Sequence, residues 1–125
     1  MKAMIATAAI LMATGTPASA QEITSGLSDR YTGCVARAGR NTVQSGLCAQ
    51  SELAAQDARL NKSYQQVMRQ LASQPARRTA LRNAQRSWLR ARDYACKIDQ
   101  DTIDNTCLVT RTAARANELE RRIRF

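Results

Sequence analysis

Residues 81–96 read LRNAQRSWLRARDYAC. Apolar side chains recur in this stretch at steps of three and four residues, the period of one helix face: Leu81, Ala84, Trp88, Ala91 and Ala95. Trp88 is the only tryptophan of the chain and the largest side chain on this face. The pattern predicts an amphipathic helix that packs against the rest of the protein with Trp88 as its anchor.

Two polar residues, Gln85 and Arg92, lie on this otherwise apolar face. A buried guanidinium needs a carboxylate partner, because burying it alone is costly. Asp57 lies on the apolar face of an earlier segment, between Leu53 and Leu60. We therefore expect Asp57 and Arg92 to meet between two helices, with Gln85 hydrogen-bonded nearby. A half-buried pair that fixes helix register is the first interpretation, and a binding role is the alternative.

The same helix carries many arginines. From residue 77 to residue 97 there are seven cations and one acid, Asp93. Four of the arginines recur every four residues and form one continuous row, the basic ridge: Arg78, Arg82, Arg86 and Arg90. A solvated helix face is the ordinary interpretation of such a row. A patch that binds an anionic partner is the alternative.

The first 20 residues contain a cation at Lys2, an apolar run over residues 3–13 and small residues before Gln21. This order is typical of a secretory signal peptide cut between Ala20 and Gln21. The apolar run is shorter than the roughly 20 residues that span a bilayer, and no later segment is apolar enough to cross a membrane. We expect a signal peptide over 1–20, a flexible leader over 21–28 and one folded domain over 29–125 in the periplasm or outside the cell. A retained N-terminal anchor is the alternative.

Loss of Lys2 with the signal peptide lowers the formal charge of +9 by one, to +8. The mature chain is long enough for one domain with a modest core. Its helix signals are local. Ser28 and Gly39 bracket a short helix over 29–38, and Asn41 caps a second helix that runs to about residue 72. The apolar face of this second helix consists of Leu53, Leu60, Tyr64, Val67 and Leu71.

Pro75 is suited to begin the third helix, which runs to about residue 98. An acidic connection over 99–105 follows, and a fourth helix runs over 106–124. The apolar face of the fourth helix consists of Leu108, Thr112, Ala116, Leu119 and Ile123. No strand pattern or internal repeat is present. The prediction is an all-α fold, a small disulfide-tied helical hairpin bundle of one short and three longer helices, with Trp88 and Tyr64 as core anchors.

All four cysteines follow the predicted signal peptide: Cys34, Cys48, Cys96 and Cys107. An even number in an exported domain predicts two disulfide bonds. Four cysteines allow three pairings. We favour the two local bonds, Cys34–Cys48 and Cys96–Cys107, each of which closes a short loop. A zinc site is the alternative, but the spacing lacks the CxxC pairs typical of structural zinc. We therefore expect no metal and no cofactor.

Few residues here suit catalysis. The chain has no histidine, the commonest general base. It has no glycine-rich phosphate loop and no GxSxG turn. Asp99, Asp101 and Asp104 lack the turn glycine and distal glutamate of a calcium loop, so a solvated acidic turn is expected. We therefore expect a non-enzymatic protein. Nucleic acid is the usual partner of an arginine-rich helix, but export argues against it and favours anionic envelope polymers.

Three blocks of sequence follow one another in the chain: CAQSELAAQDARLNKSY from Cys48, LRNAQRSWLRARDYAC from Leu81 and CLVTRTAARANELE from Cys107. Together they resemble the LprI-type lysozyme-inhibitor N-terminal domain family. The resemblance covers about residues 31–123. It implies a small exported helical protein with paired cysteines, and some family members inhibit lysozyme. It also adds weight to a structural role for seven residues: Asp57, Asn61, Tyr64, Gln85, Trp88, Arg92 and Asp93.

Two functions follow as hypotheses. The first is an exported binding protein that inhibits lysozyme by blocking its cleft. The second is an envelope-binding module whose basic ridge docks an anionic glycan, a lipid or an acidic protein.

Overall fold

The computed structural model describes residues 26–125, so the predicted signal peptide and residues 21–25 of the leader lie outside the described residues. Over that range the chain forms four helices, α2 (Asp29–Ala38), α3 (Thr42–Gln70), α4 (Pro75–Ala95) and α5 (Asn105–Arg121). The prediction of an all-α fold with one short and three longer helices is confirmed. None of these helices is both long enough and apolar enough to cross a membrane.

Three helices begin at residues that favour a helix N-terminus, as the sequence predicts. The Ser28 hydroxyl accepts from the backbone N–H of Tyr31 at 3.1 Å and caps α2. The Asn41 side chain caps α3 in the same way. Gly39, with φ of 56°, ends α2 in a backbone conformation that favours glycine. Pro75 begins α4, where its missing N–H costs no hydrogen bond.

The end of the predicted leader is tied to the fold. The backbone carbonyl of Gly26 accepts from Gln56 Nε2 at 2.9 Å. The Ser28 hydroxyl donates to the buried carboxylate of Glu52. Leu27 packs against the apolar cluster that α2 and α3 form with Val109 of α5. Residues 26–28 are therefore anchored to α3 rather than loose.

Two helices end earlier than the sequence predicts. α4 ends at Ala95 because a tight turn follows, in which Ile98 N–H donates to the carbonyl of Thr102 at 2.9 Å. α5 ends at Arg121 because the next residues turn toward α3. There the side chain of Gln70 accepts from Arg124 N–H at 2.6 Å and donates to the carbonyl of Arg122 at 3.2 Å.

Both local disulfide bonds form as predicted. Cys34 and Cys48 join α2 to the start of α3, with their Cα atoms 5.8 Å apart. Cys96 and Cys107 join the end of α4 to the start of α5, with their Cα atoms 5.4 Å apart. Each bond closes a turn between consecutive helices and therefore limits how far their joined ends can separate.

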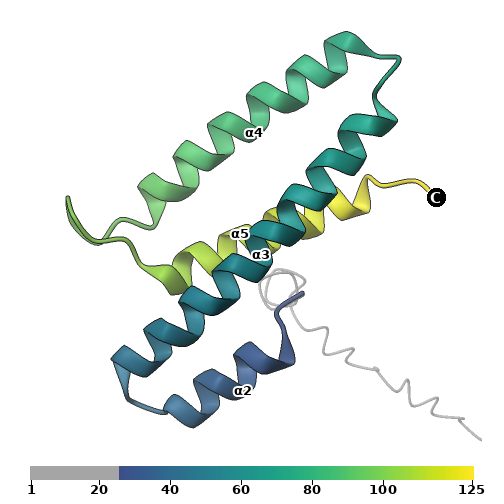
Figure 1. Ribbon diagram of the computed structural model, residues 1–125. Helices are drawn as coiled ribbons and strands as arrows, with labels where there is room; N and C mark the ends of the chain where they lie inside the picture. The colour runs from purple at the N-terminus through teal and green to yellow at the C-terminus, as the bar shows by residue number, and fades with distance from the viewer. Residues whose placement is uncertain (1–25) are drawn as a thin grey trace, which may run out of the picture.

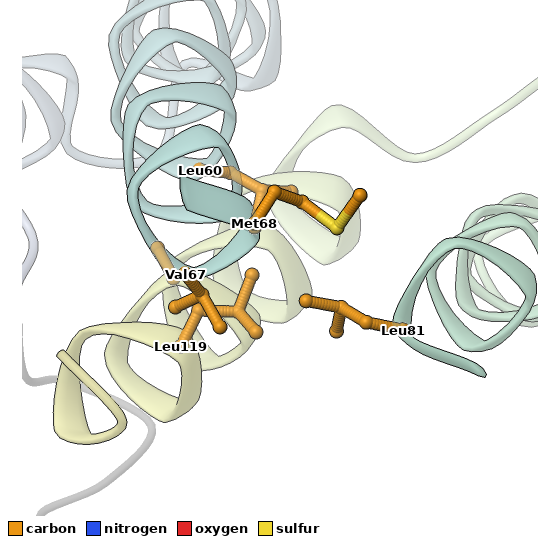
Figure 2. Packing of buried hydrophobic residues seen from close by; sticks show 6 residues of the cluster. Leu60, Val67, Met68, Leu81 and Leu119 are labelled. Carbon is orange, nitrogen blue, oxygen red and sulfur yellow. The ribbon is translucent and has the colours of Figure 1, made fainter. Parts of the chain in front are cut away.

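Helix α3 is the centre of the molecule (Figure 1). It makes its most extensive contacts with α5, while α2 folds back beside its N-terminal half. The main apolar cluster lies where α3 and α5 pack, and Leu81 is its only buried member from α4. Figure 2 shows Leu81 extending from α4 toward Met68, Val67 and Leu119. The cluster consists of Leu60, Val67, Met68, Leu81, Ala116 and Leu119.

Helix α4 packs much less completely than its apolar pattern predicts. Its only buried residues are Leu81 and Gln85. Trp88 and, on α3, Tyr64 are partly buried and pack against the edge of the main cluster. The small residues of the predicted apolar face, Ala84, Ala91 and Ala95, are exposed. Most of the surface of α4 therefore faces solvent.

Replacing Leu119 by alanine should lower the free energy of unfolding by about 2–5 kcal/mol, because this side chain is fully buried and its loss leaves a cavity. Urea denaturation followed by circular dichroism measures the change. The control is Leu89→Ala on α4, where the leucine is exposed and the change should stay within about 1 kcal/mol. Similar losses for the two variants would contradict the position of the core.

Candidate functional site

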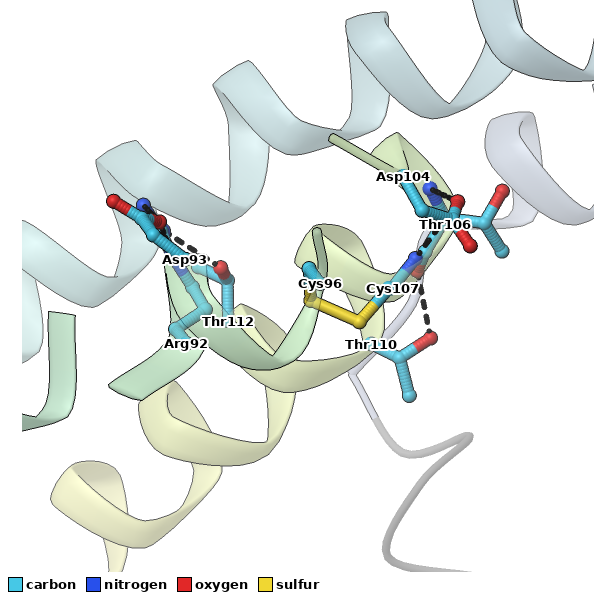
Figure 3. The surroundings of a disulfide bond; sticks show 8 residues. All are labelled: Arg92, Asp93, Cys96, Asp104, Thr106, Cys107, Thr110 and Thr112. Carbon is cyan, nitrogen blue, oxygen red and sulfur yellow. Dashed lines mark hydrogen bonds and ion pairs between the residues drawn. A yellow bond between two sulfur atoms is a disulfide. The ribbon is translucent and has the colours of Figure 1, made fainter. Parts of the chain in front are cut away.

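Arg92 connects three helices. Its Nη1 atom lies 3.3 Å from Asp57 Oδ1 on α3 and 3.1 Å from Thr112 Oγ1 on α5. Its Nε and Nη2 atoms lie 3.0 and 2.9 Å from Oδ1 of the neighbouring Asp93. The Arg92 side chain is 12% exposed, whereas those of Asp57 and Asp93 are both 51% exposed. The guanidinium is thus enclosed, and its carboxylate partners face solvent. Figure 3 shows Arg92, Asp93 and Thr112 together.

Gln85 does not join the pair of Asp57 and Arg92, contrary to the expectation from the sequence. Its Oε1 atom accepts from Arg115 Nε of α5 at 3.0 Å. The Arg115 side chain is only 8% exposed, and its Nη1 donates to Glu118 Oε2 at 3.0 Å. The position of α4 decides this, because it brings Gln85 within hydrogen-bond distance of Arg115 on α5.

Trp88 contacts both enclosed arginines. The guanidinium carbon of Arg92 is 5.4 Å from the centre of the indole ring, and that of Arg115 is 5.9 Å from it. Both distances fit cation–π contacts. We call this group the α4–α5 polar cluster: Gln85, Trp88, Arg92, Thr112 and Arg115.

Sequence reasoning missed the α5 half of this cluster. Arg115 follows Thr112 by three residues and precedes Leu119 by four, so it lies on the predicted apolar face of its helix. An arginine at such a position is the signal that would have identified it. Glu118, three residues further on, is the carboxylate partner that such an arginine needs.

The basic ridge is mostly exposed. Arg82, Arg86 and Arg90 face solvent, and Arg78 is partly buried with an Nε atom that has no hydrogen-bond partner. Within residues 26–125, no acid forms an ion pair with any of the four. Their charges are therefore not compensated locally, which favours contact with an external anion.

One part of the ridge forms the wall of a groove between α3 and α4. The groove has a volume of about 410 Å³. It brings ridge arginines together with Asp57 and Tyr64, two of the residues singled out from the sequence. Its full lining is Asp57, Leu60, Asn61, Tyr64, Arg82, Gln85, Arg86 and Leu89.

The turn between α4 and α5, which we call the clamped turn (residues 96–107), is held at its ends by the second disulfide. Asp99 Oδ1 accepts from the backbone N–H groups of Asp101 and Thr102, both at 2.9 Å. The hydrogen bond from Asp101 is the main cause that lowers the pKa of the exposed Asp99 carboxyl. Asp99 therefore stays ionised in mildly acidic solution.

Large apolar side chains are exposed at and beside the clamped turn. Tyr94, at the end of α4, is 80% exposed, and Ile98 and Ile103 of the turn are 67% and 42% exposed. Sequence reasoning described this connection only as acidic. The two isoleucines among its acids were the signal of a mixed apolar and acidic surface. Asp104 has a different role, because its side chain caps α5.

The described part of the chain offers surfaces for binding. Over residues 26–125, no group of three or more His, Cys, Asp or Glu side chains is arranged to hold a metal ion. Two exposed surfaces combine charge with apolar side chains, namely the groove beside the basic ridge and the clamped turn. Both belong to α4 or follow it directly.

Replacing Arg92 by alanine should lower the melting temperature, because the contacts to Asp57, Asp93, Thr112 and Trp88 are lost together. A loss of about 1–3 kcal/mol is expected for hydrogen bonds to a charged group. Each kcal/mol corresponds to about 4–8 °C in a domain of this size. The control is Arg90→Ala, two residues away on the exposed ridge. Equal melting temperatures for the two variants would show that Arg92 does not support the fold.

Comparisons with known proteins point to one family. The family model described as "Lysozyme inhibitor LprI" matches residues 34–119. The match begins at Cys34, contains both disulfides and all of α3 and α4, and ends at the buried Leu119. No curated protein and no solved structure matches the chain. The matched segment covers well over half of the sequence, and the chain therefore belongs to the LprI lysozyme-inhibitor family.

Proposed function

We propose that this protein is an exported, non-enzymatic inhibitor that binds lysozyme and blocks its substrate cleft. The observation that carries the proposal is the family match over residues 34–119. Two disulfide bonds support export, because such bonds persist in oxidising compartments. The target and the contact surface below are proposals that rest on this membership.

The basic ridge is the surface that we assign to the cleft. Lysozyme cleaves its substrate between two carboxyl groups that flank the scissile bond. A guanidinium recognises a carboxylate through two parallel hydrogen bonds, so an arginine row suits such a cleft. Arg82, Arg86 and Arg90 are exposed, unpaired with acids and carried by one continuous helix. A rigid helix loses little conformational entropy when it binds.

The clamped turn carries negative charge, opposite in sign to the basic ridge. The mature chain carries +8, and host-type lysozymes are also basic, so the two proteins repel each other at long range. Asp99 and Asp101 lie in the turn that follows α4, beside the exposed Ile98 and Ile103. We propose that this turn contacts the basic surface next to the cleft, where its acids and apolar side chains offset the repulsion.

The mature, disulfide-bonded protein should inhibit lysozyme acting on a soluble neutral oligosaccharide. Such a substrate avoids the false inhibition that arises when a cationic protein coats anionic cell walls. We expect complete inhibition near one equivalent of protein when concentrations exceed the dissociation constant. Absence of inhibition at high micromolar protein would refute the proposed function.

The double variant Arg82→Gln/Arg86→Gln should raise the inhibition constant about tenfold or more, because it removes central contacts of the proposed interface. The matched control is Arg37→Gln/Arg40→Gln, which removes the same charge from exposed positions at and just after the end of α2. Equal effects of the two double variants would mean that net charge, and not the ridge, governs binding.

A second candidate function rests on the uncompensated charge of the ridge. If the protein does not bind lysozyme, the basic ridge would bind an anionic envelope glycan or a lipid head group. The salt response separates the two functions. Binding to a soluble polyanion such as heparin should weaken steeply between low and moderate salt, because exposed charges are screened. Lysozyme inhibition should persist or improve, since screening also reduces the repulsion between two basic proteins.

A further inference from the structure

A cavity of the described domain lies away from both the basic ridge and the clamped turn. It has a volume of about 710 Å³ and lies between the C-terminal half of α3, the N-terminal half of α4 and the end of α5. Sites for small organic ligands usually have volumes of about 300–1,000 Å³. None of its lining residues belongs to the groove that contains Arg82 and Arg86, so the two hollows open on different faces of α4.

The cavity exists because α4 presents small residues toward it. Ala80 and Ala84 line it and are exposed, so no large side chain fills the space beside Leu81. Figure 2 shows Leu81 as the side chain that extends from α4 toward Val67 and Met68 across this region. The floor of the cavity is apolar, and it consists of Val67, Leu71, Ala80, Leu81 and Ala84.

The rim of the cavity is cationic. Four arginines and two glutamines complete the lining, which contains no acid: Arg77, Arg115, Arg122, Arg124, Gln70 and Gln74. Glu118, outside the lining, pairs with both Arg115 and Arg122, at 3.0 and 2.8 Å. Two cations therefore share one carboxylate. No acid forms an ion pair with Arg77 or Arg124 in the described domain.

Hydrogen bonds fix the wall of the cavity that the residues at and after the end of α5 form. Gln70 of α3 bonds to the backbone of both Arg122 and Arg124, at 3.2 and 2.6 Å. At the other side, Gln85 and Glu118 hold the guanidinium of Arg115, which is only 8% exposed. Fixed walls of this kind reduce the entropy that a ligand must overcome on binding.

We propose that this cavity binds a single-chain amphiphile with an anionic head group, such as an alkyl phosphate or a fatty acid. The apolar floor covers the chain, and the unpaired Arg77 and Arg124 bind the head group. A bare anion would leave the floor exposed to water, and a neutral amphiphile would leave the cations without a partner. This site is independent of lysozyme inhibition, because it shares no residue with the basic ridge.

Isothermal titration of the mature, disulfide-bonded protein tests the proposal. The probes are dodecyl phosphate below its micelle concentration, the neutral dodecyl maltoside and inorganic phosphate. We expect saturable binding of one dodecyl phosphate per chain and at least about tenfold weaker binding of the other two probes. Trp88, the only tryptophan, reports binding by fluorescence, because its ring contacts Arg115 of the cavity wall.

Three variants localise the binding. Ala84→Leu fills the cavity from an exposed position and should weaken dodecyl phosphate binding at least about tenfold. Arg77→Gln should weaken it about fivefold, and Arg86→Gln on the other face of α4 should change it by less than about twofold. Ala80→Leu gives a second filling variant if thermal melting shows that Ala84→Leu does not fold.

Several outcomes would overturn the proposal. They are the absence of saturable binding, equal binding of the neutral amphiphile, or full binding by a folded filling variant. Equal binding of inorganic phosphate would identify an anion site only. Equal weakening by Arg77→Gln and Arg86→Gln would indicate attraction by net charge rather than by the cavity.

Discussion

The attachment of α4 to α5 through two enclosed arginines sets the position of α4, and with it the positions of the basic ridge, the clamped turn and the cavity. Arg92 and Arg115 both contact the ring of Trp88, and they donate hydrogen bonds to Thr112 and Gln85, respectively. Each cation–π contact contributes about 0.5–2 kcal/mol. Burial of Leu81, the only large apolar side chain that α4 buries, contributes about 1.5–3 kcal/mol. Polar contacts and apolar burial therefore hold α4 with comparable strength.

This mode of attachment leaves most of α4 free for binding. A helix held by a full apolar face would bury that face against its neighbours and leave no space beside it. Here the polar cluster and the disulfide Cys96–Cys107 hold the C-terminal half of α4 to α5, while Leu81 supports the other half. The groove and the larger cavity share no lining residue, and each is lined by a different set of α4 residues. Polar contacts also restrict geometry more tightly than apolar contacts, because hydrogen bonds depend on direction.

Charge is distributed unevenly over this helix and the turn that follows it. The basic ridge carries unpaired arginines, and the clamped turn carries Asp99 and Asp101 beside exposed isoleucines. A strongly basic protein can therefore still present a local surface that attracts another basic protein. Over distances longer than about 8–10 Å the net charge is largely screened at physiological salt, so local complementarity decides the contact.

Four helices, the caps of the first two and both disulfides could be predicted from the sequence, because these features depend on residues close together in the chain. Ser28, Asn41 and Pro75 act within one helical turn, and each disulfide closes a short loop. The contact between Asp57 and Arg92 was also predictable from the sequence, but only the tertiary structure showed which residues of α5 contact α4. Gln85 and Arg115 are 30 positions apart, and periodicity shows which face a residue occupies but not which helix lies opposite it. The position of α4 relative to α3 and α5 leaves its alanines exposed and the cavity beside them open. An apolar pattern shows which side chains can be buried, but only the packing of the helices determines which of them are buried.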